Sequence, residues 1–91
     1  MIRVFALYPQ APDASSYAEH VELTRRVVPG AAVRHGRILG SATGEADVAY
    51  YFEAEFPDRE AWKAARAGLL ESAEDAQKLG VPFTVYFAEI E

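Results

Sequence analysis

The sequence contains no cysteine, which excludes disulfide bonds, thiolate metal ligands and thiol nucleophiles and fits a reducing compartment. It also contains no apolar run that approaches the roughly 20 residues of a membrane-spanning helix. The N-terminal stretch MIRVFALYPQ is interrupted too early to be a secretory signal. We therefore expect a cytoplasmic protein with no part in a membrane.

Positive charge is scarce and scattered. Nine Lys and Arg residues stand against 14 Asp and Glu residues, which gives a net charge of −5. Nucleic-acid binding needs clustered basic residues, so we expect no nucleic-acid partner. The chain also lacks the G-x-S-x-G, P-loop, G-x-G-x-x-G and H-E-x-x-H patterns. Two histidines without a third ligand at a recognisable spacing do not indicate a metal site. We expect neither a cofactor nor a metal.

What is present is a strong alternation of strand and helix patterns in 91 residues, of which 51% are hydrophobic. A chain of this length is predicted to form a single domain over residues 1–91. The strands are predicted at 2–8, 32–39, 48–56 and 81–90. With two helices between them, the order is β-α-β-β-α-β. This order is typical of the α+β ferredoxin-like fold, a four-stranded antiparallel sheet with two helices on one face.

The helix boundaries are predicted from capping residues. Ser16 followed by Glu19 forms a capping-box pattern for a first helix that runs to about Val28. Pro57-Asp58 opens a second helix. In that helix Trp62, Ala65 and Leu69 share an inner face, and Arg59, Lys63 and Arg66 share an outer one. The stretch Ser72–Asp75 is interpreted as the cap of a short further helix that ends near Leu79.

Two helices cover only one face of a sheet. The other face is predicted to carry Tyr51, Tyr86 and Ile90, or Phe5 and Leu7, according to the strand register. A patch this apolar is typical of an interface. We therefore expect a homodimer in which two copies pack through their sheet faces.

A histidine occurs on the apolar stripe of the first helix. At 100° per residue, His20 falls on the core-facing side near Tyr17 and Thr24. Buried polar groups need hydrogen-bond partners, a polar cavity or a ligand. One interpretation is a structural histidine that donates to a backbone carbonyl. The other is a small pocket between helix and sheet, in which the imidazole meets a ligand and exchanges a proton near neutral pH.

The second histidine lies on a strand. If Leu39 pairs with Val48, then His35 faces Phe52 and lies on the helix side of the sheet together with Tyr50. His35 is then either plain half-exposed surface or part of the lining of the same pocket.

Several short stretches, taken together, resemble the EthD-like family of the dimeric α/β-barrel superfamily. They are MIRVFALYP, His20-x-x-Leu23, the PG after the first helix, YFEAEFPDREAWKAA and PFTVYFAEIE. The resemblance implies a ferredoxin-like protomer, a homodimer whose sheets close into a barrel, and a family histidine at His20. Phe83-Thr84 match a late F-T pair of the family. The family's aromatic pair before the histidine is replaced by Ser15 and Ser16.

Two function hypotheses follow. The resemblance implies a cofactor-free oxidoreductase, monooxygenase or cyclase-type enzyme that acts on a small apolar oxygenated ligand. In this hypothesis His20 and Tyr17 are catalytic, and the substrate-binding residues are Thr24, His35, Tyr50 and Phe83. The alternative is a dimeric module that binds a small molecule or serves in stress, without catalysis.

Overall fold

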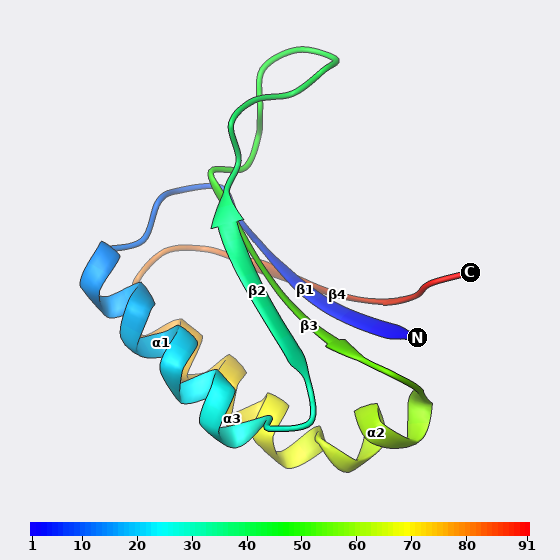
Figure 1. Cartoon of the computed structure of the whole chain (residues 1–91). Coiled ribbons are helices and arrows are strands. Elements are labelled where there is room, and N and C mark those ends of the chain that lie inside the picture. Colours follow the sequence, from blue (N-terminus) through cyan, green and yellow to red (C-terminus); the bar gives the residue numbers. More distant parts are fainter.

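The computed structural model describes all 91 residues and forms one antiparallel sheet with its helices on one side (Figure 1). The strands are β1 (Ile2–Tyr8), β2 (Ala32–Arg37), β3 (Tyr50–Phe56) and β4 (Thr84–Glu89). The helices are α1 (Ala14–Val27), α2 (Arg59–Ala64) and α3 (Arg66–Gln77). The sheet order is β2-β3-β1-β4. This arrangement confirms the predicted βαββαβ ferredoxin-like fold, with the second helical segment divided into α2 and α3.

The core lies between the sheet and the helices because the strands alternate. In β1, the residues Ile2, Val4, Ala6 and Tyr8 are buried, while the residues between them are only partly buried. In β3, Phe52, Ala54 and Phe56 are buried on the same side. The predicted pairing of β2 with β3 is confirmed, since His35 lies opposite Phe52 and Arg34 opposite Glu53.

The first helix begins earlier than predicted. Its N-cap is Asp13, whose carboxylate accepts a hydrogen bond from the backbone N–H of Ser16 at 3.0 Å. The hydroxyl groups of Ser15 and Ser16 donate to the same oxygen. The backbone bond from Ser16, followed by the two hydroxyl bonds, lowers the pKa of Asp13 below its usual value. The predicted capping box at Ser16 and Glu19 is therefore wrong, because an ionised carboxylate three residues earlier already caps the helix.

The second helical segment begins as predicted, with Asp58 as the N-cap of α2. Its interruption falls at Ala65 and not at Ser72. Ser72 lies inside α3, where its hydroxyl group bonds to another helix, so it does not act as a cap. One turn earlier in the same helix, Gly68 allows α1 and α3 to approach closely. A Cβ atom at Gly68 would lie only 2.0 Å from the carbonyl oxygen of Val27.

The sheet face that carries no helix is partly apolar and partly charged. Leu7 and Tyr51 pair across β1 and β3, and Phe5 stacks on Tyr86 with ring centroids 5.4 Å apart. Residues from both sets offered as alternatives from the sequence, Tyr51 and Tyr86 from one and Phe5 and Leu7 from the other, therefore occupy this face. Beside them is a network of ion pairs, in which each of two arginines contacts each of two glutamates at 3.0–3.2 Å: Arg3, Arg34, Glu53 and Glu55. None of the three helices has the length and apolar character needed to cross a membrane.

Candidate active site

Helices α1 and α3 run antiparallel and contact each other at three successive levels. His20 meets Asp75, Thr24 meets Ser72, and the carbonyl group of Val27 meets Gly68. Residues three or four apart lie on one face of a helix, so these contacts form a row along the helix pair. The row holds α3 against α1 and fixes the position of His20.

His20 is buried, with 3% of its surface exposed, and its Nδ1 lies 2.9 Å from Oδ2 of Asp75. A carboxylate accepts hydrogen bonds, so this contact places the proton of a neutral ring on Nδ1. The second ring nitrogen, Nε2, has no hydrogen-bond partner in the protein, and His20 lines a cavity. The partner of the imidazole is therefore a carboxylate and not the backbone carbonyl of the structural interpretation. This arrangement can accept a proton at Nε2.

The level next to the histidine is also polar and buried. The hydroxyl group of Thr24 donates to the backbone oxygen of His20 at 3.0 Å and lies 2.6 Å from Oγ of Ser72. Since Thr24 has only one hydroxyl proton, Ser72 is the donor in the second bond. Thr24 is fully buried and does not line the cavity. Its observed contacts are within the helix pair.

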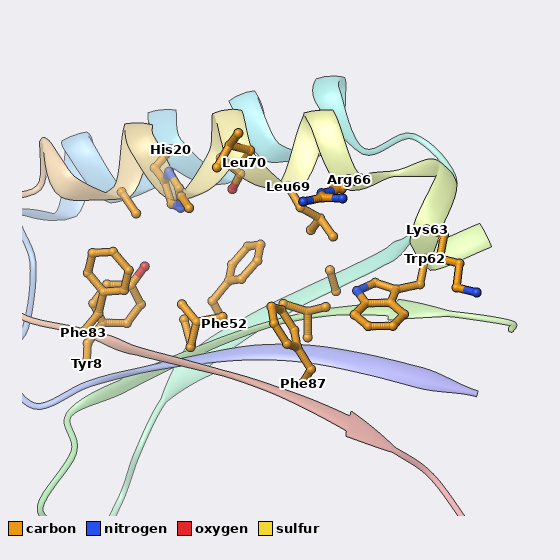
Figure 2. A pocket seen from close by; sticks show the side chains of 17 residues that line it. Tyr8, His20, Phe52, Trp62, Lys63, Arg66, Leu69, Leu70, Phe83 and Phe87 are labelled. Atoms are coloured by element: carbon orange, nitrogen blue, oxygen red, sulfur yellow. The ribbon is translucent and has the colours of Figure 1, made fainter. Parts of the chain in front are cut away.

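A cavity of about 870 Å³ lies between α2, α3 and the sheet (Figure 2). It is bounded by helix residues above and by the helix-side residues of β1, β3 and β4 below. Of its 17 lining residues, 13 are hydrophobic, so it suits an apolar ligand. Two of the predicted site residues line it, His20 and Phe83.

The remaining three predicted residues, Tyr17, His35 and Tyr50, form an aromatic cluster that does not line this cavity. The ring of Tyr17 contacts His35 and Tyr50 with centroids 5.5 and 5.8 Å apart. Its hydroxyl group donates to the backbone oxygen of Tyr51 at 3.2 Å and not to His20. Burial, with smaller contributions from neighbouring tyrosines, raises the pKa of Tyr17 and keeps this donor protonated. Asp75, and not Tyr17, is the residue that hydrogen-bonds to the ring of His20.

Tyr8 is a site residue that sequence reasoning did not find. It is 1% exposed and lines the cavity, and its ring packs 5.7 Å from the ring of Phe83. Figure 2 shows Tyr8 beside Phe83 at the end of the cavity where His20 enters from above. Its hydroxyl group has no hydrogen-bond partner in the protein, and burial raises its pKa to about 12. Tyr8 therefore presents a protonated hydroxyl group at the end of the cavity where His20 lies.

Asp75 was also missed as a site residue, because its sequence context resembles a helix cap. The sequence did contain a signal for Asp75, namely a carboxylate residue at a helical spacing from Ser72. Asp75 follows Ser72 by three residues, and His20 precedes Thr24 by four, which is the spacing that two antiparallel helices need for paired contacts. No three His, Asp or Glu side chains lie together as a metal centre would require. The expectation that no cofactor binds stays a prediction.

These features define a ferredoxin-like α+β protein with a ligand-sized cavity between its helices and its sheet. The chain is similar over its full length to an ethyl tert-butyl ether degradation (EthD) family protein of Bacillus halodurans, with 28% identity, 99% of that chain covered and a TM-score of 0.76. This finding confirms the resemblance predicted from the sequence.

Two further solved structures share the fold. A protein of Thermobifida fusca described as dimeric, ferredoxin-like and of unknown function has 12% identity and a TM-score of 0.64, covering 98% of this chain and 90% of that chain. A cofactor-independent oxygenase of Streptomyces nogalater has 21% identity and a TM-score of 0.58, again covering 98% and 90%. No family model and no curated protein matches the chain.

Proposed function

We propose that this protein is a cofactor-independent acid–base enzyme of the monooxygenase or cyclase type, acting on a small apolar oxygenated substrate. The observation that carries the proposal is the contact between His20 Nδ1 and Asp75, which leaves Nε2 without a protein partner in a residue that lines an apolar cavity. Solved structures with the same fold include a protein described as a cofactor-independent oxygenase, which supports this class of chemistry. The fold alone would not assign it.

The proposed reaction begins with removal of a proton from a carbon beside a substrate carbonyl group. His20 Nε2 takes the proton, and the electron pair of the C–H bond moves to the carbonyl oxygen to give an enolate. Tyr8 donates a hydrogen bond to that oxygen, and Asp75 stabilises the imidazolium that has formed. The enolate carbon then attacks either a second carbonyl of the same molecule or dioxygen. In both cases His20 returns the proton to an oxygen of the product.

The test isolates the first step. Deuterium exchange into the α-carbon of 2-tetralone in D2O, followed by NMR, measures proton removal without any later chemistry. We expect His20→Asn to lower the enzyme-dependent exchange rate by about 10²- to 10⁴-fold, the usual contribution of a positioned base. Asp75→Asn should also lower the exchange rate, because the carboxylate that fixes the tautomer of the His20 ring is lost. Oxygen consumption with anthrone then separates the oxygenase branch from the cyclase branch.

Glu74→Gln is the matched control, since it removes an exposed carboxylate next to Asp75 on the same helix. It should leave the exchange rate unchanged. Equal exchange by the wild-type protein and His20→Asn, with both chains folded, would contradict the proposal.

We also propose that two copies pack through the sheet face without helices. Support comes from the apolar residues Phe5, Leu7, Tyr51 and Tyr86 on that face and from solved relatives of this fold that are described as dimeric. Sedimentation equilibrium should give a dimer at micromolar concentration, and Tyr86→Glu should give monomers. A monomeric wild-type protein would contradict this part of the proposal.

The second candidate function is binding without catalysis. The observation that favours it is the apolar character of the cavity, in which His20 is the only histidine or carboxylate that lines the wall. If 2-tetralone binds and the wild-type protein does not accelerate its exchange, binding without catalysis becomes the better account.

A further inference from the structure

The cavity has two chemically different ends. Figure 2 shows His20 and Tyr8 at one end, and Trp62, Lys63 and Arg66 at the other. Lys63 and Arg66 are the only charged residues besides His20 that line the cavity. Both side chains are exposed, as is that of Arg59, so they agree with the expected outer helix face and stand at the rim of the cavity.

The two cations are free of acidic partners. Arg3, Arg34 and Arg59 each pair with glutamates at 2.9–3.2 Å. Neither Lys63 nor Arg66 forms an ion pair or a side-chain hydrogen bond, although the chain carries a net charge of −5. Lys63 belongs to α2 and Arg66 to α3, and Figure 2 shows their charged groups at separate places along the rim. An anion at this rim would form a charge-assisted hydrogen bond with either of the two side chains.

The separation of the two ends sets the length of a ligand. Arg66 is the first residue of α3, and Asp75, which holds His20, is nine positions later. At a rise of 1.5 Å per residue, this spacing corresponds to about 13 Å along the helix. The stretch between them is apolar and open, since Leu70 and Phe87 are more than 60% exposed. A ligand of this length with an apolar body would cover the side chains of Leu70 and Phe87.

We propose that the cavity binds an elongated monocarboxylate, with its acid group at the rim that carries Lys63 and Arg66, its apolar body along Leu70 and Phe87, and its far end at His20. This inference rests on the proposed function, which takes the cavity as the ligand-binding site, and it adds the chemical class of the ligand. The anion site needs no catalytic competence. Binding of an acid can therefore be measured whether or not His20 acts as a base.

The experiment uses the only tryptophan, Trp62, which lines the cavity beside Phe87 with ring centroids 5.6 Å apart. Its fluorescence reports titrations with decanoate and with decan-1-ol, two ten-carbon probes that differ in the acid group. Both are used below the concentration at which they aggregate, and calorimetry repeats each titration. We expect decanoate to bind at least about tenfold more tightly, as a charge-assisted contact implies. Added salt should weaken decanoate binding and leave decanol binding unchanged.

The variant Lys63→Gln with Arg66→Gln should remove the preference and keep the affinity for decanol. Arg25→Gln with Arg26→Gln is the matched control, because it changes the net charge equally on the exposed side of α1. His20→Asn should keep the preference for decanoate, so a failure of the proposed catalysis leaves this result unaffected.

Three results would overturn the inference. One is equal affinity for the two probes, and another is a preference that persists in the Lys63 and Arg66 double variant. The third is decanoate binding that weakens as the protein concentration rises through dimer formation, which would assign the open groove to a second copy. Thermal melts of each variant verify that it is folded.

Discussion

Strands β3 and β4 lie on either side of β1, and both present apolar residues toward the helices, yet their surroundings differ. On β3, Phe52, Ala54 and Phe56 are 7% exposed or less. On β4, Val85 and Phe87 are 38% and 64% exposed. The β3 part of the helix-side face is therefore closely covered, although Phe52 and Ala54 also reach the cavity, and we call it the filled half. The β4 part is the open side of the cavity floor, and we call it the hollow half. The alternation of residues along a strand determines which face of the sheet a side chain lies on. The position of α3 determines whether that side chain is covered by a helix.

The position of α3 follows from its partner. The row of contacts at His20, Thr24 and Val27 holds α3 against α1. Its own apolar residues Leu69 and Leu70 line the cavity, and Leu70 is 62% exposed. The filled half of the face provides stability, and the hollow half provides the space in which His20 and Tyr8 can meet a ligand.

The largest expected effect comes from matched truncations on the two strands. Phe56→Ala removes a fully buried ring and should lower the free energy of unfolding by about 3–5 kcal/mol. Phe87→Ala removes an exposed ring and should lower it by less than about 1 kcal/mol. Urea unfolding of both variants measures the difference. Similar losses at the two positions would mean that the cavity is filled in solution.

A smaller effect is expected where the two helices touch. Gly68→Ala introduces a Cβ atom 2.0 Å from the carbonyl oxygen of Val27, so the helices must move apart. Overpacking of this kind should lower the free energy of unfolding by about 1–3 kcal/mol. It should also lower the rate of 2-tetralone exchange, because Asp75 moves relative to His20.

Ala67→Ser is the control for this prediction, since it alters an exposed position next to Gly68 on the same helix. A Gly68→Ala variant that is as stable and as active as the wild-type protein would show that the close approach of α1 and α3 does not fix the site.

The smallest effect is a pH dependence at the boundary between the filled and hollow halves. Burial raises the pKa of Tyr8 from its usual value of about 10 to about 12, so the folded protein keeps a proton that the unfolded chain releases. This contribution to stability is complete below pH 10 and is lost as the pH rises toward 12. At pH 11 the loss is about 1 kcal/mol.

Urea unfolding at pH 9 and pH 11 checks this prediction. Tyr8→Phe should lose less stability over that interval than the wild-type protein. An identical loss in the two proteins would mean that the hydroxyl group of Tyr8 is hydrated in the folded state.

Local patterns predicted the element order, the register of β2 on β3 and the inward position of His20, because each depends on alternation or helical periodicity within one segment. They failed where a tertiary contact decides. Ser72 and Asp75 match a capping pattern, but Thr24 and His20 are their partners in the fold. Lys63 and Arg66 are exposed as expected, but the sequence did not show that they stand at the rim of a cavity. Tyr8 belongs to a strand, and its pattern indicates only a core residue. It lines the cavity because α3 does not pack directly on it.

The most direct test of the account is the tautomer of His20, measured by long-range ¹H–¹⁵N NMR of the labelled protein at a pH where the ring is neutral. The account predicts a proton on Nδ1, held by Asp75, and an unprotonated Nε2 at the cavity wall. A proton on Nε2, or the same tautomer in Asp75→Asn as in the wild-type protein, would contradict it.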